Sequence, residues 1–299
     1  MQGTAKTDLP KRLPPWVTSR TGLLGPGDDL KRRLRKGRLV TVCEEARCPN
    51  LGECFSRGTA TFMLLGERCT RRCEFCSVST GRSGPADPLE PRRVAEAAAD
   101  MELTYVVVTS VARDDLPDEG AGQFAATVAA LKHRLPGVAV EVLTPDFGGR
   151  DELIGTVIDA RPEVFGHNLE TVARLTPVVR GRARYERSLE VLATAASMCD
   201  RAGYGQVKTG LMVGLGETRA ELSQALADAR ATGCALVTVG QYLRPTREQM
   251  PVERYVEPAE FDEIADEARE LGFAEVASGP LVRSSYRADQ LYRTAEETA

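Results

Sequence analysis

The sequence predicts an α/β fold whose parallel strands form a partial (β/α)6 barrel of the TIM type. After residue 60, short apolar runs rich in β-branched residues alternate with longer amphipathic stretches, and this alternation is typical of repeated βα units. Six such units follow one another with no break in composition, which favours one barrel, complete or partial, over two domains. A doubly wound open sheet is the alternative arrangement.

Each unit consists of an expected strand and a helix that follows it. The strands are expected at residues 60–65, 105–109, 138–143, 163–167, 207–213 and 236–242. The helices are expected at residues 92–101, 123–135, 150–159, 185–201, 218–232 and 259–271. In the last helix, apolar residues from Phe261 to Leu271 recur at helical spacing, and Pro258 suits the first turn. We therefore expect a barrel core over residues 59–278, an N-terminal extension over 1–58 and a C-terminal extension over 279–299.

Composition excludes some classes of protein. The net charge of -4 argues against a general nucleic-acid-binding protein, which needs a broad excess of Lys and Arg to neutralise phosphates. The apolar runs are far shorter than the about 20 residues of a membrane-spanning helix, and the first residues lack the apolar core of a secretory signal. We therefore expect a cytoplasmic protein that binds neither nucleic acid nor membrane. One run, residues 31–38, has six basic residues in eight positions; it is either a solvated helix face or a docking site for an acidic protein.

Three of the eight cysteines lie directly after the first expected strand. Cys69, Cys73 and Cys76, here called the loop triplet, are separated by three and then two residues, and in a barrel the loops after the strands carry the functional groups. Three core thiols are a poor explanation, because the charged Arg71 and Arg72 lie between them. A structural zinc site uses four ligands, whereas three thiolates on a four-iron cluster leave one iron open for a substrate or cofactor. A colourless, zinc-stabilised binding module is the non-catalytic alternative.

A second set of cysteines lies just upstream. Cys43, Cys48 and Cys54, here called the upstream triplet, have four and then five residues between them, and two sets of three thiols indicate two clusters. Cys199 is in step with the apolar face of its expected helix, and Cys234 begins an expected strand. We expect these last two thiols to be buried and chemically quiet.

The spacing of the loop triplet, after a strand and at the start of a chain of βα repeats, resembles the radical S-adenosylmethionine (radical SAM) superfamily. Six segments in the same order resemble the lipoyl synthase family: VCEEARCPNLGECF, GTATFMLLGERCTRRCEFCSV, TSVARDDLPDEGA, HNLET, KTGLMVGLGE and RSSY. This likeness spans about residues 40–290. Phe55, Glu119 and Arg287 depart from residues that are frequent in that family, and none of the three is an expected ligand.

The resemblance implies two [4Fe-4S] clusters. The loop triplet would hold the cluster whose open iron binds S-adenosylmethionine and cleaves it to a 5'-deoxyadenosyl radical. The upstream triplet would hold an auxiliary cluster that is consumed as the source of sulfur. Its unusual fourth ligand would be Ser284, the first serine of RSSY. The resemblance therefore makes the three cysteines of the loop triplet and Ser284 the expected catalytic residues.

The resemblance also implies a reaction and its partners. The enzyme would be a sulfurtransferase that inserts sulfur at C6 and C8 of an octanoyl chain amide-linked to a lysine of a lipoyl carrier domain. The carriers would be E2 subunits of 2-oxoacid dehydrogenases or the H protein of glycine cleavage, and an electron donor is required. Such carriers are commonly acidic, which favours docking at residues 31–38. The runner-up is a biotin-synthase-like protein or a methylthiotransferase, although a nucleic-acid-modifying methylthiotransferase would be expected to bring an RNA-binding domain.

Five further residues are candidates for contact with the cofactor or substrate. Arg113, in TSVARDD, is a candidate partner for the methionine carboxylate. Asn168 and Glu170 end the fourth expected strand, where polar side chains face the barrel mouth. Lys208 begins the fifth strand and is expected to pair with a carboxylate. Gly214 lies in the turn GLMVGLGE, where glycine lets the backbone approach a ligand closely.

Overall fold

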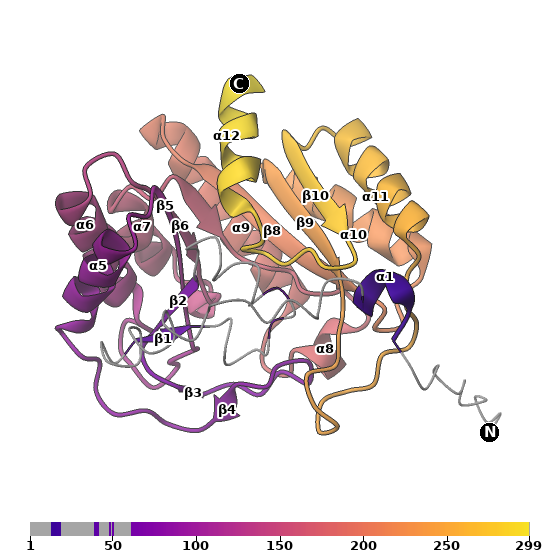
Figure 1. Cartoon of the computed structure of the whole chain (residues 1–299), viewed down its shortest axis with the longest axis horizontal. Helices are drawn as coiled ribbons and strands as arrows, with labels where there is room; N and C mark the ends of the chain where they lie inside the picture. Colours follow the sequence, from indigo (N-terminus) through magenta and orange to yellow (C-terminus); the bar gives the residue numbers. More distant parts are fainter. Residues whose placement is uncertain (1–12, 19–38, 42–47, 49, 51–60, 299) are drawn as a thin grey trace.

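The structure, a computed structural model, describes residues 13–18, 39–41, 48, 50 and 61–298. Its main feature is an eight-stranded sheet in the order β1-β2-β5-β6-β7-β8-β9-β10 (Figure 1). These strands are β1 (Val40–Thr41), β2 (Thr61–Leu64), β5 (Tyr105–Ser110), β6 (Ala139–Leu143), β7 (Val164–Gly166), β8 (Gln206–Val213), β9 (Leu236–Gln241) and β10 (Glu275–Gly279). β1 is antiparallel to β2, and the other neighbouring pairs are parallel. Among the described residues β1 and β10 are the two edges, so the barrel is open.

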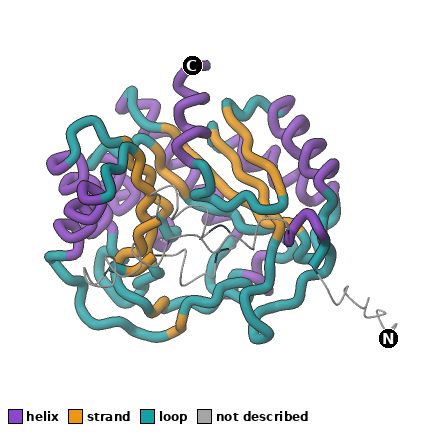
Figure 2. Tube along the Cα trace, viewed as in Figure 1, coloured by secondary structure: helices purple, strands orange, loops and turns teal. Residues whose placement is uncertain are grey.

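Helices cover the convex side of this sheet (Figure 2). The six longer ones are α5 (Glu90–Asp100), α6 (Ala121–Arg134), α7 (Asp151–Asp159), α9 (Tyr185–Ala202), α10 (Arg219–Ala231) and α11 (Pro258–Glu270). The strands present β-branched side chains to them, and Val106, Val108, Val140 and Val142 are fully buried. Strands of a parallel sheet are covered on both faces, which explains their nearly continuous apolar sequence. The short elements are α1 (Pro15–Thr18), η1 (Phe147–Gly149) and α8 (Thr176–Val179).

The last helix, α12 (Ala288–Thr298), lies on the opposite, concave side of the sheet (Figure 1). Its Leu291 and Ala295 form one apolar cluster with Val164 of β7 and Leu236 of β9. Both of those strand residues are the first of their strands. α12 therefore fills the lumen of the open barrel near the amino ends of the strands, where a closed barrel would be filled by side chains of its own strands.

The predicted α/β partial barrel is confirmed. All six expected strands and all six expected helices are present, and each end lies within two residues of the expected position. The structure adds β10, a seventh parallel strand, and the lumenal helix α12. The expected division at residue 278 falls at the end of β10, and the three-part division stays a prediction. Among the described residues, no helix is both long enough and apolar enough to span a membrane.

Candidate active site

Most of the expected site residues lie at the carboxyl edge of the barrel. Cys69 follows β2, Arg113 follows β5, Glu170 follows β7, Gly214 follows β8 and Ser284 follows β10. Because parallel strands end at the same edge of a sheet, these loops share one mouth. A separate parallel pair, β3 (Arg68–Cys69) and β4 (Ser79–Thr80), brackets the segment that carries the loop triplet.

The loop triplet is held by backbone contacts from three directions. The Thr70 amide donates to the Ala112 carbonyl at 3.0 Å, and the Glu74 amide donates to the Val179 carbonyl at 2.8 Å. From the loop after β9, the Gln249 side chain donates to the Cys76 carbonyl at 3.2 Å. The segment has little regular structure of its own, so these contacts with the ends of β5 and β9 and with α8 fix where its thiols point.

The three thiols lie close enough to influence one another. Burial raises the pKa of Cys73 to about 12, and the neighbouring Cys76 acts in the same direction. Burial also raises the pKa of Cys76 to about 11, with Cys69 again adding to the effect. None of the six described cysteines forms a disulfide. Thiols in this state are neutral until a metal binds as they lose their protons.

The loop triplet supplies three thiols from one loop, the donor set of a four-iron cluster with one open iron. Among the described residues, no three His, Cys, Asp or Glu side chains converge closely enough to hold one ion. A [4Fe-4S] cube instead binds each thiolate at a different iron, so its ligands lie farther apart while sharing one loop. Two backbone amides, those of Arg71 and Ala112, point at the Cys69 sulfur at 3.4 and 3.3 Å, as expected for a thiolate that carries negative charge.

A chain of polar contacts links the loop triplet to the RSSY segment. The Ser284 hydroxyl donates to the Asn168 side-chain oxygen at 3.1 Å, and the Asn168 amide donates to Glu170 at 3.0 Å. Burial raises the pKa of Glu170, and the Glu170 charge acts on both Cys73 and Cys76. Three predicted site residues from two distant segments are therefore brought beside the loop triplet.

On its other side, the segment that carries RSSY lies near Cys48, the one cysteine of the upstream triplet that the structure describes. The buried Asn50 side chain donates to the Leu281 carbonyl at 2.6 Å, and burial raises the pKa of Cys48 while the charge of Arg283 opposes that rise. A Cβ at Gly240 of β9 would collide with the Val282 carbonyl, so the segment lies directly on the sheet. Cys43 and Cys54, like residues 31–38, lie outside the described residues.

Two of the expected contact residues, Arg113 and Gly214, are committed to other partners. Arg113 forms an ion pair with Asp115 at 2.8 Å and also donates to the Leu65 and Gly84 carbonyls. The Gly214 amide donates to Glu217 at 2.6 Å. Its φ of +94° and the close approach of Gln241 explain why only glycine fits there. Both positions thus have a sufficient structural explanation, and their contact with a cofactor stays a prediction.

Lys208 is the one expected contact that does not lie at the carboxyl edge. It occupies the first half of β8, is 1% exposed and pairs with the equally buried Glu141 at 2.8 Å. The Tyr105 hydroxyl donates to the same carboxylate at 2.7 Å. The expected pairing of Lys208 with a carboxylate is thus observed, but the partner belongs to the barrel interior.

Sequence reasoning missed two arginines and an aspartate beside the loop triplet. Arg180 is buried, donates to the Leu169 carbonyl and to Ser188, and its charge opposes the rise in the pKa of Cys73. Arg71 pairs with the fully buried Asp146. The position of Asp146 directly after a strand was the available signal, because polar residues there face the barrel mouth.

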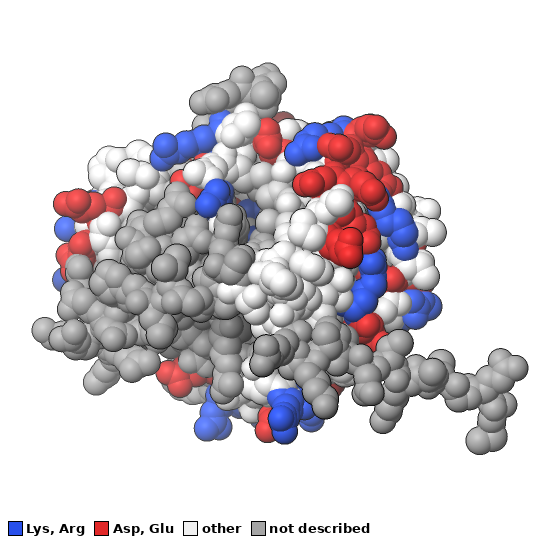
Figure 3. Space-filling model, turned by 45° about the vertical axis from the view of Figure 1, so that its right-hand side comes forward, with Lys and Arg blue, Asp and Glu red and all other residues white. Residues whose placement is uncertain are grey.

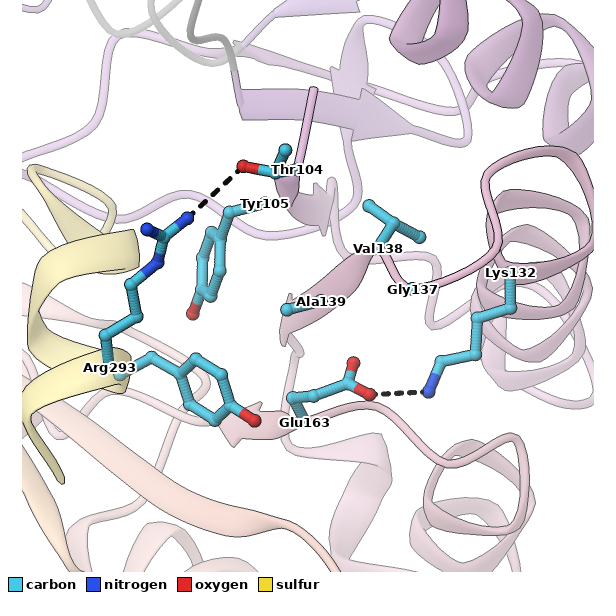
Figure 4. Close-up of a pocket in the computed structure, with 9 residues that line it drawn as sticks. Thr104, Tyr105, Lys132, Gly137, Val138, Ala139, Glu163 and Arg293 are labelled. Atoms are coloured by element: carbon cyan, nitrogen blue, oxygen red, sulfur yellow. Dashed lines mark hydrogen bonds and ion pairs between the residues drawn. The ribbon is translucent and has the colours of Figure 1, made fainter. Parts of the chain in front are cut away.

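A pocket of about 430 Å³ lies at the opposite, amino edge of the barrel (Figure 4). Lys132 and Glu163 pair across one wall at 2.8 Å, and Arg293 of α12 reaches Thr104 on another. Lys132 also donates to the Tyr204 hydroxyl, which itself donates to Glu163. Lys132 and Glu163, two of the charged residues that line this pocket, are therefore already paired with each other.

Surface charge also differs over the molecule. Exposed carboxylates gather over α11, where Asp262, Glu263 and Asp266 face solvent (Figure 3). Around the loop triplet, the exposed charged side chains include Arg72 and Arg182, which contact carboxylates at 3.7 and 3.9 Å.

Solved structures with this fold include a protein bound to S-adenosylmethionine and a hydrogenase maturase. Streptococcus suis SuiB bound to S-adenosylmethionine aligns with a TM-score of 0.55 at 10% identity, covering 74% of this chain and 51% of that one. HydG, a maturase of the [FeFe]-hydrogenase, aligns with a TM-score of 0.55 at 15% identity, covering 85% of this chain and 63% of that one. The chain thus spans about half to two thirds of their length, and at these identities the likeness shows the fold alone.

An open parallel barrel with three cysteines after its first parallel strand defines the radical SAM class, and the family model of the Radical SAM superfamily matches residues 63–229. A lipoyl synthase of Methylococcus capsulatus is 55% identical over 285 residues, which is 94% of this chain and 87% of that protein. A lipoyl synthase of Thermus thermophilus is 55% identical over 270 residues, or 90% and 83% of the two chains. Within the radical SAM superfamily, this chain belongs to the lipoyl synthase family.

Proposed function

We propose that this chain performs the lipoyl synthase reaction at the carboxyl edge of its barrel. The family uses S-adenosylmethionine and two [4Fe-4S] clusters. The loop triplet holds one cluster, and the upstream triplet together with Ser284 holds the other. The substrate is an octanoyl chain amide-linked to a lysine of a carrier domain, and the product carries sulfur at C6 and C8.

The observation that supports this assignment is that Ser284 and its neighbour Arg283 have partners toward both Glu170 and Cys48. On one side Ser284 reaches Glu170, beside the loop triplet, through Asn168. On the other side, the positive charge of its neighbour Arg283 opposes the rise in the pKa of Cys48 that burial causes. A substrate carbon between the two sets would lie near both clusters, as a reaction that activates a carbon and then sulfurates it requires.

When bound, the clusters and S-adenosylmethionine supply a carbon-centred radical and sulfide, and the protein supplies position and exclusion of water. The half-buried thiols of Cys73 and Cys76 would give up their protons on binding iron, because only the thiolate is a ligand. Arg180 offsets part of the negative charge that then accumulates. Asn168 orients the Ser284 oxygen with its carbonyl and holds the Glu170 carboxylate with its amide.

Serine is a hard oxygen ligand on iron, a weaker match than thiolate. Its use at one corner of a cluster is consistent with a corner that must open as sulfur leaves. Full turnover by Ser284→Cys would show that this lability is not needed.

The carriers and the reductant remain part of the proposal. E2 subunits of 2-oxoacid dehydrogenases and the glycine-cleavage H protein are the carriers, an electron donor reduces the cluster of the loop triplet, and the reaction takes place in the cytoplasm. An acidic carrier would be repelled by the face of α11 and attracted by Arg72 and Arg182 beside the loop triplet. Residues 31–38 would add to that attraction.

The test is an anaerobic incubation of the reconstituted protein with an octanoyl-lysyl peptide, S-adenosylmethionine and dithionite, followed by mass spectrometry of the peptide. We expect a gain of two sulfurs and about one product per chain, since the auxiliary cluster is the sulfur source and is consumed. Formation of 5'-deoxyadenosine with no sulfur in the peptide would contradict the proposed substrate.

Ser284 and Ser285 offer a matched pair for the ligand assignment. Ser284→Ala should retain the S-adenosylmethionine cleavage that depends on the loop triplet but lose sulfur insertion. Ser285→Ala, which removes the neighbouring hydroxyl, should retain both activities. The reverse result would move the ligand role to Ser285.

A further inference from the structure

The two neighbouring arginines of the loop triplet have very different surroundings. The Arg71 side chain is 9% exposed, and its Nε and Nη2 both donate to Asp114 Oδ1, at 2.9 and 2.6 Å. The same Nη2 donates to Asp146 Oδ1 at 2.6 Å. Arg72 is 75% exposed and has only a 3.7 Å contact with Glu74. A buried guanidinium shared by two carboxylates is costly to disrupt, whereas an exposed pair contributes little.

The two carboxylates lie in loops that follow different strands of the barrel. Asp114 follows β5 and also accepts a hydrogen bond from the Thr70 hydroxyl at 2.6 Å. Asp146 follows β6, caps η1 through the Gly148 amide and is fully buried. Burial alone would raise the pKa of Asp146, but Arg71 outweighs it and lowers the pKa to about 2. Arg71 therefore ties the loop between Cys69 and Cys73 to the ends of two strands.

The same contacts hold the Arg71 backbone amide against the sulfur of Cys69, one of the expected cluster ligands. The Arg71 amide donates to Cys69 Sγ at 3.4 Å, and the Ala112 amide, two residues before Asp114, donates to the same sulfur at 3.3 Å. Hydrogen bonds to the sulfur ligands are one of the factors that set the reduction potential of an iron-sulfur cluster. Movement of the loop would lengthen at least the first of these bonds.

We propose that Arg71 is a positioning residue for the cluster of the loop triplet, acting through Cys69, with Asp114 and Asp146 as its anchors. This inference rests on the proposed function only in that the loop triplet must hold a cluster. Arg71 pre-orders the loop before the cluster binds, and it keeps the amide donors aimed at Cys69 once the cluster is present. It touches no reacting atom.

The experiment uses the full chain in a Cys48→Ala background, so that only the loop triplet carries a cluster. Arg71→Gln, Arg71→Lys and, as matched control, Arg72→Gln are reconstituted anaerobically. The rate of iron loss to a chelator and the reduction potential, followed by electron paramagnetic resonance, are then measured. Circular dichroism of each apoprotein reports folding.

Arg71→Gln should lose iron at least about tenfold faster than the background protein, because charge-assisted hydrogen bonds to two carboxylates are removed. Its potential should fall, since the amide donors to Cys69 are no longer held. Arg71→Lys, which keeps the charge but not the two-pronged geometry, should be intermediate, and Arg72→Gln should match the background. Equal iron loss and equal potential in Arg71→Gln and Arg72→Gln would overturn the proposal.

If Arg71→Gln fails to fold, Asp114→Asn tests the same proposal in the same assays. It keeps a hydrogen-bond acceptor but removes one anchoring charge, and unchanged iron loss and potential in this variant would likewise overturn the proposal. If the background protein itself binds no cluster, the assignment of the loop triplet has failed. That outcome is seen before any Arg71 variant is compared.

Discussion

At the amino edge of the barrel, Lys208 pairs with Glu141 and Lys132 pairs with Glu163, and a tyrosine hydroxyl bonds to each carboxylate. At the carboxyl edge, three thiols and Glu170 share one mouth, and burial raises the pKa of Cys73, Cys76 and Glu170. At the amino edge these polar groups complete one another, whereas at the carboxyl edge the thiols of the loop triplet are left for a cluster to complete. Substitutions at the two edges should therefore affect different properties.

The largest expected effect is on activity at the carboxyl edge. Cys73→Ala removes one of three cluster ligands, so sulfur insertion should fall below detection, while the free energy of unfolding of the apoprotein changes by less than about 1 kcal/mol because the thiol is only half-buried. Product is measured by mass spectrometry, and unfolding by urea titration. Cys199→Ala, on α9, is the control and should retain activity. Residual turnover by Cys73→Ala would remove this residue from the ligand set.

The next effect is on stability at the amino edge. Lys208→Met leaves the Glu141 carboxylate buried without its cation and should lower the free energy of unfolding by about 3–5 kcal/mol. Adding Glu141→Gln should restore part of that loss, since the unpaired charge is gone. The free energy of unfolding of the single and the double variant is measured by urea titration of the apoproteins. Weakened binding of S-adenosylmethionine with unchanged stability would instead support the cofactor contact expected from sequence.

A pH dependence should come from a buried residue directly after β7. Burial lowers the pKa of His167 from 6.5 to about 4, and Arg180 acts in the same direction. The unfolded chain then binds the proton first, so stability is fully present above pH 6.5 and falls as the pH is lowered to 4, by up to about 3 kcal/mol. Asp146, with a pKa near 2 instead of 3.8, contributes in a separate window below pH 3.8.

Substitution isolates the His167 contribution. His167→Gln should flatten the dependence of the free energy of unfolding on pH between 4 and 6.5, in urea titrations of the apoprotein. His133, the other histidine of the chain, is exposed, and His133→Gln should leave the slope unchanged. A slope that survives in His167→Gln would assign the effect to other groups.

The smallest effect is expected in the wall of the amino-edge pocket. Tyr204→Phe removes one hydroxyl that bonds to Lys132 and Glu163, but those two still pair with each other. The free energy of unfolding should fall by about 1 kcal/mol. Sulfur insertion should be unchanged, and a marked loss of activity would mean that this edge also contributes to the reaction.

The elements with strong local patterns were predictable from the sequence, and the contacts between distant segments were not. The strand around Val106 is a nearly continuous apolar run, and the loop triplet is defined by spacing alone. β10, in contrast, contains Ala277, Ser278 and Gly279, and its side chains are mostly half-buried. Its identity as a strand depends on pairing with β9, which no local pattern shows.

The residues of the site also divide into those that the sequence could predict and those that it could not. The placement of Ser284 near the cysteines followed from resemblance to a family, not from its surroundings, which in sequence look like a polar tail. The pairing of Lys208 with a carboxylate was expected, but its partner Glu141 lies on another strand, 67 positions away, and no local pattern identifies it. Arg71 looked like any charged loop residue, because its partners lie 43 and 75 positions away.

The contact between Asn50 and Leu281 joins residues 231 positions apart. During synthesis the chain emerges from its amino end, so the neighbourhood of Cys48 cannot form until nearly the last residues have left the ribosome. The contacts of the loop triplet with Ala112, Val179 and Gln249 become available earlier. The order of translation thus makes the surroundings of the loop triplet available before the contact between Asn50 and Leu281.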